Sequence, residues 1–237
     1  MDELPMTRKL FWEDMYLKEF DARVVSADAS RLVLDQTAFN PRGGGLVSDV
    51  GTIDSVEVAE VVKEGDEIIH VMRGEGSWAP GQHVHGVLDW EKRHRIMRMH
   101  TAAHLLSAVV NSETGALITG NQISPDESRV DFNLENFDKE KMSAYVDRVN
   151  REAGRGLEVT TFFMKREEAL SNPGFVKLAN AMPPTLAELR IVKIGDADTQ
   201  ADGGVHVANT KEVGTVMSLG TENKGKSNRR LHFTVRP

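Results

Sequence analysis

Residues 90–113 read WEKRHRIMRMHTAAHLLSAVVNSE, a stretch that neither proline nor glycine interrupts. Apolar residues recur within it at helical spacing, at Ile96, Met99, Ala103, Leu106 and Val110. This spacing places them on one face, so the pattern predicts a long amphipathic helix that Gly115 ends. The chain has a different pattern on each side of this helix. We therefore expect a change of architecture near residue 90.

The region before residue 90 is predicted to be rich in β-strands. Short runs of alternating apolar residues are separated by Gly, Pro and Asp, which is typical of hairpins and small barrels. The expected strands include residues 31–35, 51–58, 67–73 and 83–89. We therefore expect a small β-barrel-like domain over residues 1–90.

The region after Gly115 mixes strand patterns with one further helix, predicted over residues 138–154 with Asp138 as its N-cap. The expected strands are residues 116–123, 129–133, 157–164, 188–194, 205–208, 213–219 and 230–235. This order indicates an α+β protein whose second domain spans residues 91–237.

The amino-acid composition excludes several kinds of site. The 237 residues include 29 Lys and Arg and 36 Asp and Glu, which gives a formal net charge of −7. This charge argues against nucleic-acid contact over the whole surface but is compatible with a local basic patch. The absence of Cys excludes disulfides, a Cys nucleophile, iron–sulfur clusters and thiolate zinc sites. Because no apolar run suits a membrane span or a signal peptide, we expect a cytoplasmic protein with no membrane partner.

Two histidines, His100 and His104, lie four residues apart in the predicted helix. They share one helical face, so both imidazoles can bind one metal ion. Zinc proteases with this spacing need Glu directly after the first His, where this chain has Thr101. Alone, the pair is also compatible with exposed or hydrogen-bonded histidines. A second pair, His83 and His85, shares a strand face and can bind metal in principle.

The sequence DGGVH at residues 202–206 separates a carboxylate and an imidazole by the same four residues. Gly203 and Gly204 permit a turn that brings Asp202 and His206 to one place. Three histidines and one carboxylate would suit a zinc ion. The alternative is a glycine turn next to an unrelated histidine.

A third motif, TAFNPRGGG at residues 37–45, ends in three consecutive glycines. Glycines at these positions let the backbone approach another surface closely. A phosphate-binding loop would need a Lys-Ser/Thr ending and a following helix, and this segment has neither. The alternative is a long hairpin turn.

Basic residues gather at the start of the long helix, at Lys92, Arg93, Arg95 and Arg98. Such runs are most often solvated faces. If they flank the histidines, they would instead hold a phosphodiester backbone.

Together, HTAAH at 100–104 and DGGVH at 202–206 resemble the editing domain shared by alanyl- and threonyl-tRNA synthetases, which carries HxxxH and then CxxxH as four zinc ligands. LVLDQTAFNPRGGGLVSDVGTI at 32–53 resembles the glycine-rich motif that precedes this domain in the alanyl enzymes. Four further motifs follow in the family's order: TGNQIS (119–124), RVDF (129–132), NTKEVG (209–214) and KGKSNRRLHF (224–233). With no ATP-activating domain before it, the chain resembles a free-standing alanyl-tRNA editing protein of the AlaX group, in its medium-length form.

The resemblance implies an aminoacyl-tRNA hydrolase that removes Ser from mischarged Ser-tRNA(Ala), with Gly-tRNA(Ala) as a second candidate substrate. The expected partner is the acceptor end of tRNA(Ala), and no ATP is needed. A second sieve is useful because a synthetase pocket discriminates a methylene-sized change by only about 1–3 kcal/mol. By carry-over, one Zn²⁺ per chain would be bound, and catalysis would act through it. Its ligands would be His100, His104, Asp202 and His206.

Five positions depart from the family pattern. Asp202 stands where the family usually has Cys, Val205 stands where it often has Thr, and Asn40, Arg42 and Leu46 differ from the usual residues of the glycine-rich motif. A carboxylate oxygen is a harder ligand than a thiolate, which predicts weaker metal binding or a water molecule in the place of Asp202. The resemblance assigns substrate binding to Gln122, Thr37, Gly43, Gly44 and Gly45. Two other functions stay open: a non-catalytic zinc- and tRNA-binding module, and a metal hydrolase of small amino-acid esters.

Overall fold

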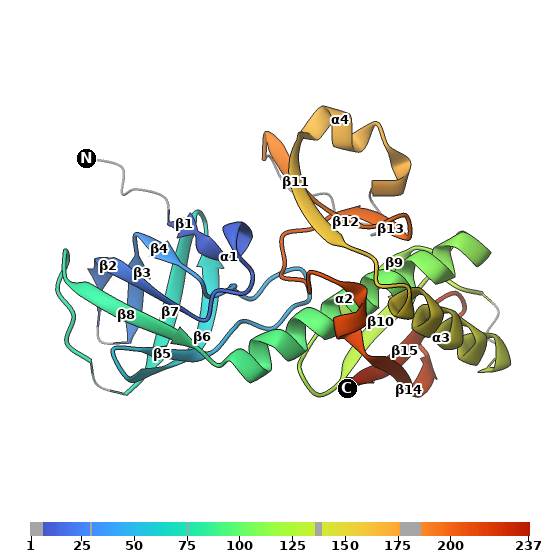
Figure 1. Ribbon diagram of the computed structural model, residues 1–237, viewed down its shortest axis with the longest axis horizontal. Coiled ribbons are helices and arrows are strands. Elements are labelled where there is room, and N and C mark those ends of the chain that lie inside the picture. The colour runs from blue at the N-terminus through green and yellow to red at the C-terminus, as the bar shows by residue number, and fades with distance from the viewer. Residues whose placement is uncertain (1–6, 29, 75, 136–138, 176–185) are drawn as a thin grey trace. The chain divides into compact units, whose positions relative to one another are not determined.

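The computed structural model describes residues 7–28, 30–74, 76–135, 139–175 and 186–237. The chain divides into two compact units, Met1–Arg95 and Ile96–Pro237. The division falls inside the long helix α2, Trp90–Thr114, which has the extent that the uninterrupted apolar period predicts (Figure 1). Gly115 ends α2 with a φ of 71°, a value that favours glycine, and its N–H donates to the Asn111 carbonyl at 2.8 Å. None of the helices in the described part of the chain could cross a lipid bilayer.

The first unit is built on a closed barrel with the strand order β2-β3-β7-β6-β5-β8, which confirms the predicted small barrel (Figure 1). Its strands are β2 (Glu19–Ala27), β3 (Arg31–Leu34), β5 (Gly51–Ile53), β6 (Val56–Glu64), β7 (Glu67–Arg73) and β8 (His83–Leu88). The short strands β1 (Arg8–Lys9) and β4 (Gln36–Thr37) pair in parallel, and helix α1 (Leu10–Glu13) follows β1. Alternate side chains such as Leu32, Ile53 and Val58 are buried and fill the barrel.

Residues 51–58 are not the single strand that the apolar alternation predicts. They form the hairpin of β5 and β6, in which Asp54 and Ser55 occupy the turn with φ values of 48° and 68°. Positive φ at both central residues is typical of the tight turn that matches strand twist. The Asp54 carboxylate also accepts the His85 N–H at 2.8 Å, which helps to hold the turn.

The glycine-rich segment forms a tight turn, as the hairpin interpretation predicts. Gly43 and Leu46 exchange backbone hydrogen bonds of 3.2 and 2.9 Å. Gly44 and Gly45 between them have φ values of 59° and 90°, a conformation that few other residues adopt without strain. The turn is exposed, so its backbone is accessible to a binding partner.

Arg93 fixes the loop that carries this motif. Its guanidinium makes a bidentate ion pair with Asp49 and also donates to the carbonyls of Ala38 and Met15. The side chain is only 1% exposed. Arg93 therefore stabilises the first unit, so neither alternative considered for the basic run, a solvated face or a phosphodiester contact, applies to this residue.

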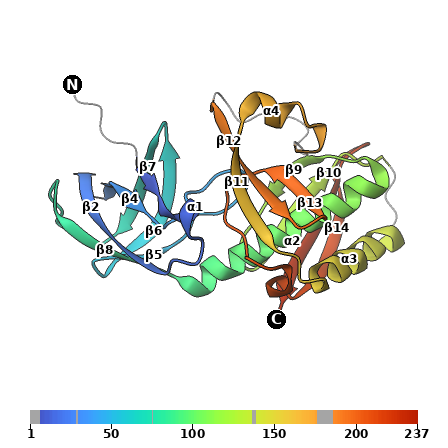
Figure 2. The same ribbon diagram turned by 45° about the horizontal axis from the view of Figure 1, so that its top comes forward.

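The second unit contains a four-stranded antiparallel sheet of order β14-β15-β10-β9 and a three-stranded antiparallel sheet of order β11-β12-β13 (Figure 2). The first has β9 (Ile118–Gln122), β10 (Ser128–Phe132), β14 (Thr215–Asn223) and β15 (Arg229–Arg236). The second has β11 (Val159–Lys165), β12 (Glu188–Ile194) and β13 (Asp198–Ala201). This mixture of helices and sheets confirms the predicted α+β class.

Helix α3 (Lys139–Gly154) covers the four-stranded sheet. The Asn150 side chain donates to the Val216 carbonyl at 3.0 Å and accepts the Val216 N–H at 2.7 Å, which ties α3 to β14. The predicted N-cap of this helix, Asp138, lies outside the described residues. The described residues of this unit also form the short helix α4 (Arg166–Leu170) and the single turns η1 (Pro173–Phe175) and η2 (Thr210–Val213).

Residues 205–208 form a loop rather than the predicted strand. Side chains of α2 form hydrogen bonds with backbone groups of this segment that a neighbouring strand would otherwise bond. The Val205 carbonyl accepts from the His100 ring at 3.2 Å, and the Val207 N–H donates to Thr101 Oγ1 at 3.3 Å. Contacts with α2 therefore shape most of the segment, and its last residue contacts a strand, where the Ala208 carbonyl accepts the Val159 N–H at 2.9 Å.

Candidate metal centre

Four side chains from two distant segments meet in the second unit: His100, His104, Asp202 and His206. Each offers one ligand atom, and these four atoms all lie within 4.8 Å of one another. The Nε2 atoms of the three histidines lie 3.5, 3.9 and 3.3 Å from the Asp202 carboxylate, in the order of their numbers. The structure therefore brings together the HxxxH and DxxxH motifs that the sequence singles out.

Helix α2 supplies the first two imidazoles because positions four apart share a helical face. His100 and His104 are only 4% and 6% exposed, and their ring centroids are 4.9 Å apart. His206 is fully buried, and its ring stacks on that of His100 at 4.1 Å. The three imidazoles are buried, whereas the Asp202 side chain is 22% exposed and gives the group access to solvent.

Each of the three rings is held through its Nδ1 atom. His100 Nδ1 donates to the Val205 carbonyl at 3.2 Å, His104 Nδ1 donates to Asp198 at 3.0 Å, and His206 Nδ1 is 3.1 Å from Thr101 Oγ1. The carbonyl and carboxylate acceptors at Nδ1 fix the ring orientation of His100 and His104 and direct their Nε2 atoms to another partner. At His206 the Thr101 hydroxyl can donate or accept, and His206 Nε2 lies 3.3 Å from Asp202 Oδ1. All three Nε2 atoms thus face the same carboxylate, an arrangement that could hold a cation.

Asp198 and Gln200 belong to the site although the sequence interpretation did not identify them. The Asp198 carboxylate bonds His104 and also accepts from the Gln200 amide at 2.8 Å. Together with Asp202 they occupy alternate positions, which share one face of an extended chain. The pattern DTQAD at 198–202 was the available signal, and it was missed because β13 was not predicted.

The loop after β13 presents Asp202 to the histidines. Its carboxylate accepts the Gly204 N–H at 2.6 Å, an Asx turn. Arg190 Nη1 donates to the carbonyls of Asp202 and Gly204, at 3.1 and 2.9 Å. Neither Gly203 nor Gly204 has a positive φ. The bend therefore depends on these hydrogen bonds and not on a left-handed glycine conformation.

Without a bound ion, the electrostatics of the cluster favour neutral His100 and His206, a protonated His104 and an ionised Asp202. Burial lowers the pKa of His100 to about 4 and holds the pKa of His206 well below its usual range. Burial also acts to lower the pKa of His104, but Asp198 and Asp202 outweigh it and raise the value to about 9. Burial raises the pKa of Asp202, yet the surrounding imidazoles hold it well below its ordinary value. A metal ion needs neutral imidazoles and a carboxylate as ligands, so its binding would displace the proton of His104.

This donor set fits a divalent transition metal. Three imidazoles and one carboxylate are ligand types that zinc accepts in four-coordinate sites, and bonded Nδ1 atoms are typical of metal-binding histidines. The described residues of the second unit could therefore hold one ion between α2 and the loop after β13.

The other predicted site residues lie elsewhere. Gln122 is at the end of β9, and its side-chain oxygen accepts from Arg129 Nε at 3.4 Å. Thr37 is buried in the first unit, 2.8 Å from His70 Nε2, and the turn of Gly43, Gly44 and Gly45 is also in that unit. Their role in substrate binding stays a prediction.

The pair His83 and His85, considered above as a second metal-binding pair, lies on β8 with both side chains exposed. His85 Nδ1 pairs with Asp21 at 2.8 Å, and this hydrogen bond raises the pKa of His85. No cluster of metal ligands among the described residues includes this pair.

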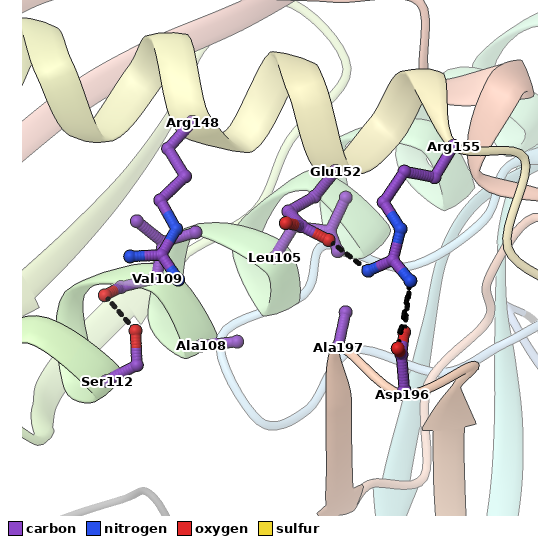
Figure 3. Close-up of a pocket in the computed structure, with 9 residues that line it drawn as sticks. All are labelled: Leu105, Ala108, Val109, Ser112, Arg148, Glu152, Arg155, Asp196 and Ala197. Carbon is purple, nitrogen blue, oxygen red and sulfur yellow. Dashed lines mark hydrogen bonds and ion pairs between the residues drawn. The ribbon is translucent and has the colours of Figure 1, made fainter.

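A separate cavity of about 270 Å³ is lined by α2, by residues of α3 and its C-terminal end, and by the turn between β12 and β13 (Figure 3). Arg155 in its wall pairs with Glu152 at 2.6 Å and with Asp196 at 2.7 Å. Arg148 pairs with Glu113 at 2.6 Å. Because the charged side chains of this cavity are paired with one another, the group of His100, His104, Asp202 and His206 is the better candidate for a catalytic site among the described residues.

Two family models match the chain, one in each unit. Residues 8–92 match the class II (A) tRNA synthetases, and residues 189–232 match the second additional domain of threonyl- and alanyl-tRNA synthetases. The latter segment includes Asp202 and His206. Over 238 residues the chain is 43% identical to the alanyl-tRNA editing protein AlaX-M of Saccharolobus solfataricus, with 98% of this chain and 100% of that protein covered. The chain belongs to the AlaX-M family of alanyl-tRNA editing proteins.

Further relatives include both a free-standing protein and a larger enzyme of which only a part is similar to this chain. The AlaX-M protein of Methanosarcina barkeri is 40% identical over 97% of this chain and 99% of its own length. The alanine–tRNA ligase of Thermococcus kodakarensis is 36% identical over 93% of this chain, which covers only 25% of that ligase. The AlaX-M family thus corresponds to about a quarter of the ligase.

Proposed function

We propose that this chain is a trans-editing deacylase that hydrolyses the ester bond of Ser-tRNA(Ala) and of Gly-tRNA(Ala). One zinc ion per chain is held by His100, His104, Asp202 and His206. The observation that carries the proposal is the meeting of four ligand atoms within 4.8 Å in a member of a family of alanyl-tRNA editing proteins.

The residues around the cluster have defined roles in this proposal. A zinc ion held by these four residues would supply Lewis acidity, either to lower the pKa of a water molecule towards about 7 or to hold the aminoacyl group while a neighbouring water attacks. Asp198 and the Val205 carbonyl accept from Nδ1 of His104 and His100, which directs Nε2 of both rings to the metal. The Thr101 hydroxyl can accept from His206 Nδ1 in the same way when His206 Nε2 binds the metal. Arg190 fixes the backbone around Asp202, so the carboxylate keeps its position.

The substrate follows from the limits of a single binding pocket. A synthetase pocket shaped for alanine rejects smaller glycine weakly, and its rejection of serine is also limited. A second site that hydrolyses the wrong ester corrects both errors. With a net charge of −7, the chain is expected to contact the acceptor end of tRNA(Ala) rather than the whole molecule.

The test is deacylation of Ser-, Gly- and Ala-tRNA(Ala) by one preparation whose zinc content is measured by mass spectrometry. We expect Ser and Gly to be released, Ala to stay attached, and about one zinc per chain. A protein with bound zinc that binds these tRNAs without turnover would be a non-catalytic binding module. Hydrolysis of free serine esters as fast as of Ser-tRNA(Ala) would instead identify a small-ester hydrolase, and either result overturns the proposal.

A further inference from the structure

An aromatic side chain of the three-stranded sheet lies in the same row as Asp202, one of the four candidate metal ligands. Phe163 on β11 is directly opposite Arg190 on β12 in the antiparallel register. On the other side of Arg190, the Asp202 N–H donates to its carbonyl at 3.0 Å, and so continues the β12–β13 pairing by one residue. Phe163, Arg190 and Asp202 therefore form one row across three adjacent segments.

Residues directly opposite one another on neighbouring strands point to the same face of a sheet. Asp198 and Gln200 share this face with Asp202 by the alternation of β13, and both contribute to the hydrogen bonds around His104. The opposite face has its own small core, in which Met164, Ile191 and Ala201 pack with Ala169. Phe163 thus lies on the face of the sheet that presents Asp202 to the histidines.

Phe163 is 54% exposed, although the centre of the same face is closed by the buried side chains of Val192 and Ile194. Lys165 is two residues further along β11, so it points to the same face, and it is also exposed. An exposed aromatic ring with a cation beside it is the combination that binds single-stranded nucleic acid, by stacking a base and pairing with a phosphate.

The spacing suits a nucleotide whose ribose ester is at the metal cluster. Neighbouring strands lie about 4.8 Å apart, so the backbones of Phe163 and Asp202 are ~10 Å apart across two spacings. The ester of an aminoacyl-tRNA is on the ribose of its last nucleotide, and the base of that nucleotide is one sugar away. Arg190, buried between the two positions and bonded to the Asp202 and Gly204 carbonyls, keeps the distance fixed.

We propose that Phe163 is the stacking platform for the terminal base of the single-stranded 3′ end of the tRNA, and that Lys165 binds a phosphate of the same end. This inference rests on the proposed function, because it supposes that a 3′-terminal ester is presented to the metal cluster. It identifies Phe163 as a substrate-binding residue in a segment, residues 157–164, that the sequence suggested only as a strand.

The test compares Phe163→Ala with Phe162→Ala in steady-state deacylation of Ser-tRNA(Ala). Phe162 is a matched control, because it is the same residue type, is 37% exposed and points to the other face of β11. Loss of one stacked base is expected to raise KM about ten-fold with little change in kcat. Phe163→Trp is expected to keep the wild-type KM, and Phe162→Ala to behave as wild type. Equal KM values for Phe163→Ala and wild type, or equal losses in both alanine variants, would overturn the platform.

Two further measurements separate this inference from the proposed function. Serine methyl ester has no base, so wild type and Phe163→Ala are expected to hydrolyse it equally; a defect in Phe163→Ala on this ester would contradict stacking. Binding of 3′-serylamino-3′-deoxyadenosine, whose amide is not an ester, is followed by calorimetry and needs no turnover. Weaker binding by Phe163→Ala, of about ten-fold, supports the platform even if the wild type deacylates no tRNA; unchanged binding overturns it even if deacylation is normal.

Discussion

Buried histidines occur in both units of the molecule, and their second ring nitrogens differ. In the barrel, His70 donates from Nδ1 to the Leu32 carbonyl at 3.0 Å, and its Nε2 lies 2.8 Å from Thr37 Oγ1. In the second unit, His100, His104 and His206 are each held through Nδ1, and all three Nε2 atoms face Asp202. Main-chain and hydroxyl oxygens satisfy both ring nitrogens of His70, whereas the Nε2 atoms of the other three histidines share one carboxylate and could bind a cation together.

This difference shows that burial alone does not identify a metal ligand. A candidate metal ligand is recognised by the partner of its second ring nitrogen, once the first is hydrogen-bonded within the protein. His70 meets both of its hydrogen-bonding needs with main-chain and hydroxyl oxygens, so we infer a structural role. The same comparison explains why Thr37, predicted to bind substrate, has its hydroxyl directed to His70 inside the barrel.

The largest expected effect comes from removing one of the three clustered imidazoles. His100→Ala leaves three ligands around the ion and an unfilled space beside Asp202, so we expect loss of bound zinc and of deacylation. The control is His83→Ala, which removes an exposed histidine from β8. Zinc content by mass spectrometry and deacylation rates are measured for both proteins. A His100→Ala variant with wild-type zinc and activity would remove the cluster from the proposal.

The second prediction concerns the residue that holds His104. Asp198→Asn removes the negative charge that His104 Nδ1 meets at 3.0 Å, while the side chain keeps its size. Loss of such a partner typically reduces metal affinity by about 10–100-fold. The measurement is competition for zinc with a coloured chelator. Asp196→Asn is the matched control: Asp196 precedes Asp198 by two residues, but its ion-pair partner is Arg155 and not a histidine.

Equal zinc affinity of the Asp198→Asn variant and the wild type would show that His104 needs no charged partner. The distinction between the histidines of the two units would then rest on Nε2 alone. A loss of affinity in Asp196→Asn as large as in Asp198→Asn would indicate a general effect of the β12–β13 turn rather than a specific hydrogen bond.

Much of the fold and part of the candidate site could be predicted from the sequence, because they depend on local patterns. The period of residues 90–113 predicts α2, and a separation of four residues places His100 and His104 on one face. The barrel follows from alternating strands separated by turn residues. The tight turn at Asp54 and Ser55 escaped notice because neither residue is glycine, the usual sign of positive φ.

Other features depend on contacts between distant segments, which a single sequence does not show. Residues 205–208 look like a strand but form a loop, because Thr101 and His100 on α2 take their backbone hydrogen bonds. In the sequence, Arg93 resembles a residue of a solvated basic face, but in the structure it is buried in an ion pair with Asp49. Asp198 was missed for the same reason, since its role arises only from its pairing with His104.

The smallest expected effect tests His70, the structural member of the comparison. Burial lowers its pKa to about 4 from an ordinary value of 6.5, so the unfolded chain takes up a proton before the folded barrel does. This contribution to stability is complete above pH 6.5 and is lost as the pH falls from 6.5 through 4. Between pH 6.5 and pH 5.5 we expect the free energy of unfolding to fall by about 1 kcal/mol on this account.

Urea unfolding followed by tryptophan fluorescence reports on the right unit, because all 3 tryptophans, Trp12, Trp78 and Trp90, lie within Met1–Arg95. The reference is His70→Gln, whose side chain can still bond the Leu32 carbonyl and does not titrate. Other histidines of the unit contribute equally to both proteins, so the difference between the two pH profiles isolates His70. Parallel profiles over this range would mean that the barrel accepts a charged His70. The two units would then differ less in how they treat buried imidazoles than their hydrogen bonds indicate.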